Sequence, residues 1–380
     1  MTDWPLDRVE ALLAPVAALP RAADLTDLAA TWPNKFLPTL LSARAAVAPL
    51  AADESAALDR SRHRIGRSDR MLRSICAAHP SVWALKGGAT RMLYPAHLVR
   101  QQDDLDLVAD DVATLWDVTA SLLAADWEVD AVWARRSPRR SGPEITVVLT
   151  QDRGDPMPDR IEVTTDPLEG DHWSVASRRL DLTATDSASL ALLLLVEEGV
   201  GRPFGARDLL DAALLLDHLA DRSAADAVID LVERHGVAVE WNRLAEALRA
   251  NPAVRRASVP EPRAVHRPGT RPSVRSARHP VWWCALRAAK RIRDREGVAP
   301  LADRLLTRLQ GTLGARRVYE SGLAMFGIPM PDEQPVAQQR FEFAGPLGML
   351  STPAGRFVLS AGGGVPESWL PPIVEARSAG

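Results

Sequence analysis

The chain has 380 residues, 46% of them hydrophobic, and a formal net charge of −3 at pH 7. This length exceeds the usual size of one domain, so two or three domains are expected, each with a core of its own. The near-neutral charge excludes a protein that coats nucleic acid with its whole surface, although local basic patches are compatible with it.

The N-terminal region, residues 1–80, predicts helices over 5–13, 25–31 and 53–78, the last with apolar residues at helical spacing. The first residues have neither the basic start nor the apolar core of a signal peptide. The longest apolar run, Leu190 to Val196, is too short to span a bilayer. The two cysteines lie far apart, which indicates free thiols in a reducing compartment. We therefore expect a soluble cytoplasmic protein without a membrane partner.

Residues 81–180 predict a unit of strands and helices. A short apolar run, Val82 to Leu85, ends in Lys86-Gly87-Gly88, which is typical of a strand, a tight turn and a helix. The sequence Asp104-Leu105-Asp106-Leu107-Val108 then alternates acidic and aliphatic residues. As a strand, it places Asp104 and Asp106 on one face, about 6–7 Å apart at a rise of roughly 3.3 Å per residue, with the leucines in the core.

A helix capped by Asp110-Asp111 and three further strands, over 127–134, 144–150 and 160–165, are predicted next. In the third strand Glu162 stands between two aliphatic residues. Two interpretations are open: it faces the paired aspartates as a third carboxylate, or it points to solvent from an edge strand.

Residues 181–252 predict a helical domain. Asp186 is expected to cap a helix over 187–200, and a second helix begins near Arg207-Asp208-Leu-Leu-Asp211. Its two aspartates, three residues apart, share a helix face. They are either site residues or carboxylates favoured by the dipole at a helix start.

The remainder predicts a Pro/Arg-rich linker over 253–280 and a basic helical segment over 281–330, with helices over 281–296 and 301–313. An irregular tail is predicted over 331–380, with short strands near 341–343 and 356–359. Residues 282–295 combine tryptophans with arginines and a lysine. They fit RNA, by stacking and charge neutralisation, or an arginine-coated helix that docks through its tryptophans.

The turn Lys86-Gly87-Gly88, followed at this spacing by Arg100-x-x-x-Asp104-Leu-Asp106, resembles the polymerase-β-like nucleotidyltransferases. It is most similar to bacterial uncharacterised nucleotidyltransferase family proteins and to the related toxins of abortive-infection (type IV) systems. Arg-Asp-x-x-Asp at 207–211 resembles a motif of the toxin branch, but the acidic Glu197-Glu198 replaces a lysine-bearing segment there. The resemblance implies an α+β fold, in which a small mixed sheet with helices (81–180) is flanked by N-terminal and C-terminal helical regions.

The implied reaction transfers NMP from an NTP to an acceptor, which is an RNA end, a protein or a small molecule, and releases pyrophosphate. The resemblance assigns Mg²⁺, or Mn²⁺ instead, to three carboxylates, and the nucleotide to five other residues. The metal and catalytic residues would be Asp104, Asp106 and Glu162; the nucleotide-binding residues would be Lys86, Gly87, Gly88, Arg100 and Asp208.

Each assignment has a structural alternative. Lys86 can extend from a strand end to solvent, Arg100 can pair with Asp103, and the aspartate pair can be loop or capping acids. The acidic residues at 197–211 suit a cationic small acceptor, whereas the segment 282–295 suits RNA. A second hypothesis is a catalytically degenerate nucleotide-binding or scaffold protein of a biosynthetic or defence gene cluster. The chain lacks the common hydrolase and dinucleotide-binding motifs, which disfavours a hydrolase or a redox enzyme.

Overall fold

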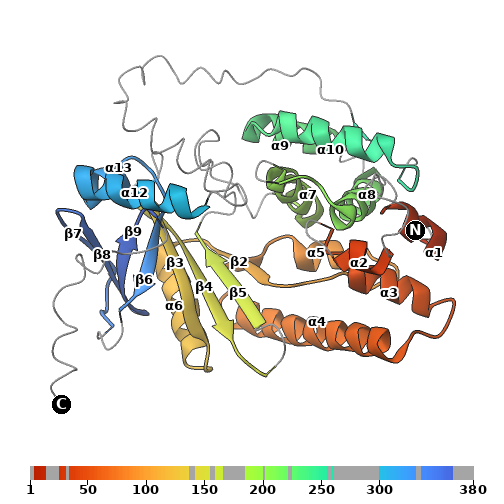
Figure 1. Cartoon of the computed structure of the whole chain (residues 1–380), viewed down its shortest axis with the longest axis horizontal. Helices are drawn as coiled ribbons and strands as arrows, with labels where there is room; N and C mark the ends of the chain where they lie inside the picture. The colour runs from red at the N-terminus through yellow and green to blue at the C-terminus, as the bar shows by residue number, and fades with distance from the viewer. Residues whose placement is uncertain are drawn as a thin grey trace. The chain divides into compact units, whose positions relative to one another are not determined.

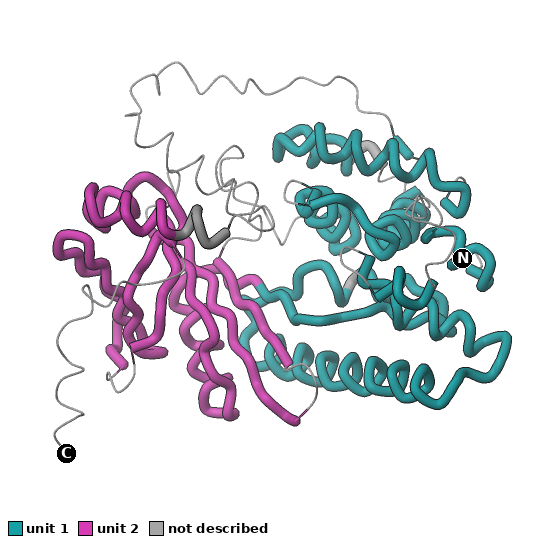
Figure 2. Tube along the Cα trace, viewed as in Figure 1, with its two compact units in different colours: residues 1–107, 167–171, 178–269 teal, residues 108–166, 172–177, 270–380 magenta. Residues whose placement is uncertain are grey.

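The computed structural model is an α+β protein whose strands form one nine-stranded mixed open sheet (Figure 1). It describes residues 4–13, 25–30, 34–136, 142–154, 159–165, 185–199, 202–220, 225–254, 259–260, 299–330 and 335–362. The chain divides into two compact units (Figure 2). Unit 1 comprises residues 1–107, 167–171 and 178–269, and unit 2 comprises residues 108–166, 172–177 and 270–380.

Unit 1 is mainly helical. Its elements are α1 (Leu6–Ala11), α2 (Leu25–Ala30), α3 (Leu37–Ala45), α4 (Ala52–Ala78), β1 (Val82–Ala84), α5 (Gly87–Arg91), the start of β2 (Leu105–Ala109), α7 (Ser187–Glu198), α8 (Ala206–Ala220), α9 (Ala225–His235) and α10 (Ala238–Ala250). Helix α7 is leucine-rich and buried on every side, because α8, α9, α10 and α5 all pack against it. The core of unit 1 therefore surrounds α7.

Several local predictions are confirmed in unit 1. The side chain of Asp186 accepts hydrogen bonds from the backbone N–H groups of Ala188 and Ser189, so it caps α7 as expected. The long helix predicted over 53–78 is α4. The N–H of Ala51 donates to the carboxylate of Glu54, which satisfies one donor at the start of that helix.

Unit 2 is built on antiparallel strands. Its elements are the end of β2, α6 (Val112–Leu123), β3 (Glu128–Arg136), β4 (Pro143–Gln151), β5 (Asp159–Thr164), α12 (Ala299–Leu313), α13 (Ala315–Glu320), β6 (Met325–Pro329), β7 (Arg340–Ala344), β8 (Leu347–Thr352) and β9 (Gly355–Ser360). The sheet order is β1-β2-β5-β4-β3-β6-β9-β8-β7. The strands predicted over 127–134, 144–150 and 160–165 are β3, β4 and β5, and Asp111 caps α6 by accepting from the N–H of Thr114.

The alternation of apolar residues explains why these strands pair. Val132 of β3 lies opposite Val147 of β4, which in turn lies opposite Val163 of β5, and all three are fully buried. One face of the strands therefore forms the core of unit 2. A one-residue slip in register would turn these valines toward the other face, so the pattern fixes the pairing.

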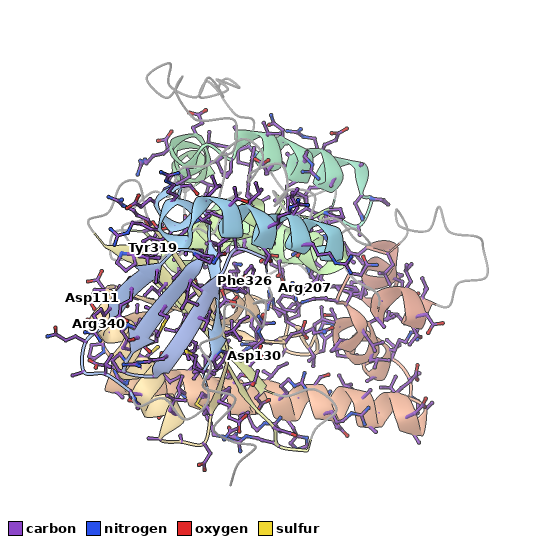
Figure 3. The ribbon with its side chains drawn as sticks, turned by 60° about the vertical axis from the view of Figure 1, so that its left-hand side comes forward. Asp111, Asp130, Arg207, Tyr319, Phe326 and Arg340 are labelled. Carbon is purple, nitrogen blue, oxygen red and sulfur yellow. The ribbon has the colours of Figure 1, made fainter. Side chains whose placement is uncertain are left out.

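The prediction for residues 331–380 is confirmed in part. The short strands predicted near 341–343 and 356–359 are β7 and β9, but β8 between them was not predicted. Residues 340–360 thus form the meander β7-β8-β9, and β6 lies within the predicted basic helical segment. The meander was not recognised because the connections are tight and the strands short. Gly345 has a φ of 58° and Gly355 a φ of 120°, conformations that suit glycine and close the two hairpins. Tyr319 and Phe326, labelled in Figure 3, come from α13 and β6. The Tyr319 ring packs against Phe341 of β7 at 4.8 Å between centroids.

Two predictions fall outside the described residues: the helix over 281–296, with the proposed RNA-binding residues 282–295, and most of the linker over 253–280. The helix predicted over 301–313 is confirmed as part of α12. Among the described helices, none combines the length and the apolar character needed to cross a membrane.

Candidate functional site

The glycine turn and the Asp-x-Asp strand lie next to each other in unit 1. The backbone N–H of Leu85, at the end of β1, donates to the carbonyl oxygen of Asp106 in β2 at 2.9 Å. Gln102 strengthens the link from the other side. Its amide accepts from Arg91 of α5 at 3.3 Å and donates to the carbonyl oxygen of Asp104 at 3.3 Å. The turn that leads into α5 is therefore held beside the residues that begin β2.

The fold itself does not require glycine at positions 87 and 88. The left-handed conformation in this turn falls on Lys86, whose φ is 50°. A Cβ at Gly87 would lie 3.4 Å from Nη1 of Arg100, and a Cβ at Gly88 would lie 3.5 Å from Leu72, which are ordinary contacts. Glycine at these positions has another physical explanation, because it lets a ligand approach the backbone closely.

The paired aspartates have the predicted alternation. Leu105 and Leu107 are buried, whereas Asp104 and Asp106 are half-buried. No described residue hydrogen-bonds or forms an ion pair with the carboxylate of Asp104. Its immediate neighbour Asp103 differs, because that carboxylate accepts from Gln101 at 2.7 Å and from Lys35 at 2.9 Å. Asp104 is thus an acid of this segment that has no counter-charge among the residues the structure describes.

Arg100 does not pair with Asp103, so that alternative is wrong. Its guanidinium makes a two-pronged interaction with Asp211 of α8, at 3.0 Å from Nε and 2.7 Å from Nη2. Tyr94 donates its hydroxyl proton to the same carboxylate at 2.7 Å. Burial raises the pKa of Tyr94 well above its ordinary value, and Asp211 adds to the shift, so the hydroxyl stays protonated and donates. The pair of Arg100 and Asp211 is buried and fixes the segment before β2.

Lys86 reaches an acid rather than open solvent, so the alternative of a solvent-extended lysine is wrong. Its ammonium lies 3.1 Å from Oε1 of Glu198 at the end of α7. Arg202 bonds Glu198 and Asp208 together. Burial alone would raise the pKa of Glu198, but Lys86, Arg202 and Arg207 outweigh it and lower the pKa to about 2. Glu198 is therefore ionised at neutral pH.

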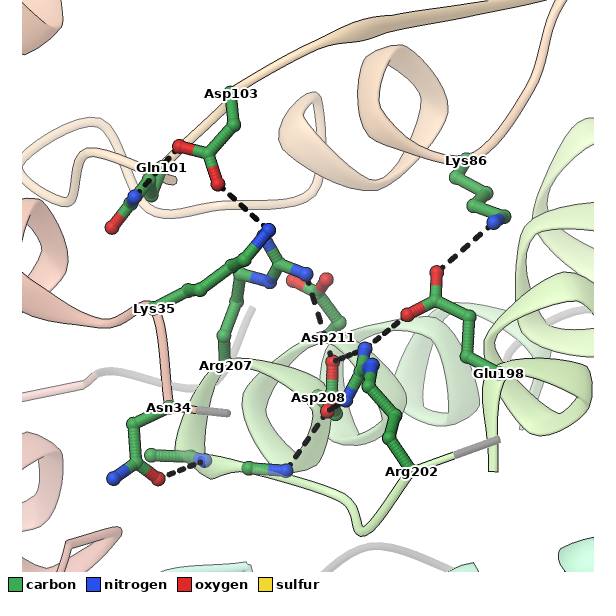
Figure 4. Close-up of polar contacts among 12 residues, drawn as sticks. Asn34, Lys35, Lys86, Gln101, Asp103, Glu198, Arg202, Arg207, Asp208 and Asp211 are labelled. Atoms are coloured by element: carbon green, nitrogen blue, oxygen red, sulfur yellow. Dashed lines mark hydrogen bonds and ion pairs between the residues drawn. The ribbon is translucent and has the colours of Figure 1, made fainter. Parts of the chain in front are cut away.

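Asp208 is fully buried at the start of α8. It accepts from the backbone N–H of Gly205 at 2.8 Å and from Arg202 at 3.1 Å (Figure 4). An acid three residues after the N-cap that bonds back to the N-cap N–H is one half of a capping box. The helix-start interpretation of this residue is thus the one that its contacts favour. Because Glu198, Asp208 and Asp211 are all paired with cations, they do not form an open acidic surface for a cationic acceptor.

Glu162 belongs to unit 2. It lies on β5 opposite Val148 of β4, is half-buried, and its carboxylate is 4.0 Å from the guanidinium of Arg160. Its role as a third carboxylate stays a prediction. Within the part of the chain that the structure describes, no three or more His, Cys, Asp or Glu side chains are grouped so that they would hold a metal ion.

The structure adds two residues that sequence reasoning missed. Lys35 pairs with Asp103, and Asn34 is buried against the start of α8. The rarity of lysine was the available signal for Lys35, since the chain has only Lys35, Lys86 and Lys290. Asn34 gave no signal, because a single asparagine in a helical region carries no pattern.

No protein-family model, curated protein or solved structure matches this chain. The interpretation of the site therefore depends on its own residues and their contacts.

Proposed function

We propose that the protein is a nucleotidyltransferase that uses Asp104 and Asp106, beside the turn at Lys86-Gly87-Gly88, to transfer NMP from an NTP to an acceptor. The observation that carries the proposal is the contrast between Asp104 and its acidic neighbours. Asp103, Glu198 and Asp211 each have a cation within 3.1 Å, whereas Asp104 has none among the described residues. A half-buried carboxylate without a counter-charge suits a site that a cation completes.

The donor chemistry fits Mg²⁺. This ion prefers oxygen ligands and is commonly held by one or two carboxylates together with substrate phosphates. Asp104 and Asp106 would supply the carboxylates, and the bound ion would neutralise charge on the triphosphate. Gly87 and Gly88 let phosphate oxygens approach the backbone, and Lys86 adds positive charge beside them.

The reaction conserves atoms and charge. An acceptor oxygen forms a bond to the α-phosphorus as the bond between that phosphorus and the bridging oxygen of the β-phosphate breaks. Pyrophosphate leaves with the bonding electrons, and the acceptor hydroxyl releases its proton to solvent water. Such transfers depend mainly on positioning the reactants and stabilising charge, which the fixed segment from Arg100 to Asp106 would serve.

The test is labelling of an acceptor with each α-³²P-NTP and Mg²⁺, offering total RNA, cell protein and a small-molecule extract in turn. Asp104→Asn and the double variant Asp104→Asn/Asp106→Asn should reduce labelling by roughly 10²–10³-fold, as expected when charge stabilisation is lost. Asp110→Asn is the matched control, because Asp110 is exposed just after β2 and should leave the rate unchanged. A double variant as active as the parent would refute the proposal. NTP binding without pyrophosphate release in every extract would favour the degenerate nucleotide-binding protein instead.

A further inference from the structure

Two lysines of unit 1 have a positive φ, which is uncommon for a residue with a side chain. Lys35 has a φ of 44° and Lys86 a φ of 50°, and both belong to the three lysines of the whole chain. Residues other than glycine seldom adopt this region, and such strain tends to persist where the surroundings hold a functional residue in place. Both ammonium groups meet carboxylates, of Asp103 and Glu198 respectively.

Asn34 ties Lys35 to the start of α8. Its side-chain oxygen accepts from the N–H of Ala206 at 3.2 Å, and its backbone oxygen accepts from the N–H of Arg207 at 3.4 Å. Its amide donates to Leu28 at 3.0 Å. The asparagine is 1% exposed, so these bonds are shielded from water. Lys35 and Arg207, distant in sequence, are thereby held together (Figure 4).

Arg207 is a largely buried cation, and the described residues leave part of its donor capacity unused. Its side chain is 12% exposed, and its shortest ion-pair distance is 3.9 Å, to Asp208. No described residue accepts a hydrogen bond from its Nε, which is buried. A buried guanidinium donor without an acceptor is costly unless something else supplies one.

A chain of ion pairs connects Arg207 to the Lys86 pair. Arg207 lies 3.9 Å from Asp208, and Arg202 bonds Asp208 to Glu198. Glu198 in turn meets Lys86 at 3.1 Å. Arg207 is therefore joined to Lys35 through Asn34 and to Lys86 through these paired acids.

We propose that Lys35, Lys86 and Arg207 form a polyphosphate-binding site that receives the triphosphate of the nucleotide. This inference rests on the proposed function and adds Lys35 and Arg207 to its binding residues. Within each of the nearby pairs, Arg100 with Asp211 and Arg202 with Asp208, the charges cancel. Lys35 and Lys86 meet Asp103 and Glu198 at 2.9 and 3.1 Å, whereas the shortest ion-pair distance of Arg207 is 3.9 Å. A ligand with several anionic oxygens can accept from all three cations, and the planar guanidinium of Arg207 is suited to phosphate oxygens.

The probe is inorganic tripolyphosphate, titrated calorimetrically into the full-length chain without a divalent metal. Arg207→Gln and Lys35→Gln should each weaken binding about tenfold or more, which corresponds to the loss of one charge-assisted hydrogen bond. Arg207→Lys should bind with intermediate affinity, because it keeps the charge but lacks Nε. Arg60→Gln is the matched control, since Arg60 is exposed on α4 and should leave the affinity unchanged.

Thermal unfolding without ligand separates folding from binding. Lys35→Gln should fold normally because the lysine is one-third exposed, so it keeps the test valid if Arg207→Gln is unstable. Unchanged tripolyphosphate affinity in Lys35→Gln, or no binding by the parent chain, would overturn the inference. Failure of the proposed function would give a different result. Tripolyphosphate would bind with an affinity that depends on Arg207, but no acceptor would be labelled.

Discussion

The two units use buried and half-buried ion pairs in different ways. In unit 1 the pairs join segments that are far apart in the chain, such as Arg100 with Asp211 and Lys86 with Glu198. In unit 2 the buried pair of Arg135 and Glu144 joins residues directly opposite each other on β3 and β4. Charge therefore helps to define how the helices of unit 1 assemble. In unit 2 the strand register already sets how the strands are arranged. The ion pair there lies between residues that the register has already placed opposite each other.

The largest effect is expected from Asp211→Ala. It leaves the guanidinium of Arg100 buried without its partner and removes the acceptor of Tyr94. Losing one member of a buried pair should lower the free energy of unfolding by about 3–5 kcal/mol, measured by urea denaturation. Asp110→Ala, at an exposed site, should change it by less than about 0.5 kcal/mol. A loss below 1 kcal/mol for Asp211→Ala would show that this pair does not hold unit 1 together.

A somewhat smaller, pH-dependent effect is expected from Glu198→Gln. The pKa of Glu198 falls from 4.5 to about 2 on folding. Because the folded-state pKa is the lower one, the carboxylate stabilises the protein above pH 4.5, and this contribution is lost as the pH falls from 4.5 toward 2. The fall in pKa corresponds to roughly 3 kcal/mol at neutral pH. Unfolding free energies measured from pH 7 to pH 2.5 should converge for parent and variant at the acid end, and parallel curves would contradict this account.

The smallest effect is expected in unit 2. Replacing both members of its pair, in Arg135→Met/Glu144→Met, should change the free energy of unfolding by no more than about 1 kcal/mol, because apolar residues can substitute for a buried pair. The single variant Glu144→Met should be clearly less stable than the double, since it removes the carboxylate that Arg135 meets across the strands but keeps the buried charge. If the double variant is as unstable as the single one, the ion pair matters to unit 2 as much as the long-range pairs matter to unit 1.

Much of the fold was predictable because its signals are local. Alternating valines indicated β3, β4 and β5, and the acids Asp111 and Asp186 marked helix starts that their side chains do cap. In the meander β7-β8-β9 only the first and last strands were predicted, and β8 was missed, since the strands are short and their glycines and prolines are typical of irregular segments.

The candidate site was only partly predictable. The turn at Lys86 and the strand at Asp104 carry a pattern in sequence, and the bond from Leu85 to Asp106 brings them together. For Arg100 the structural alternative to nucleotide binding was the nearby Asp103, because sequence reasoning favours short separations, whereas the structure pairs it with Asp211, 111 residues away. Which of several acids a buried arginine meets depends on tertiary packing, and the local sequence does not encode it.

The buried interaction of Arg100 with Asp211 and Tyr94 has a kinetic consequence. The loop that leads to β2 cannot swing away without carrying a charged group out of its shielded surroundings. The aspartates would thus occupy their final positions before any nucleotide arrives. Ligand capture should then proceed at the rate of diffusional encounter, with no slow ordering step before it.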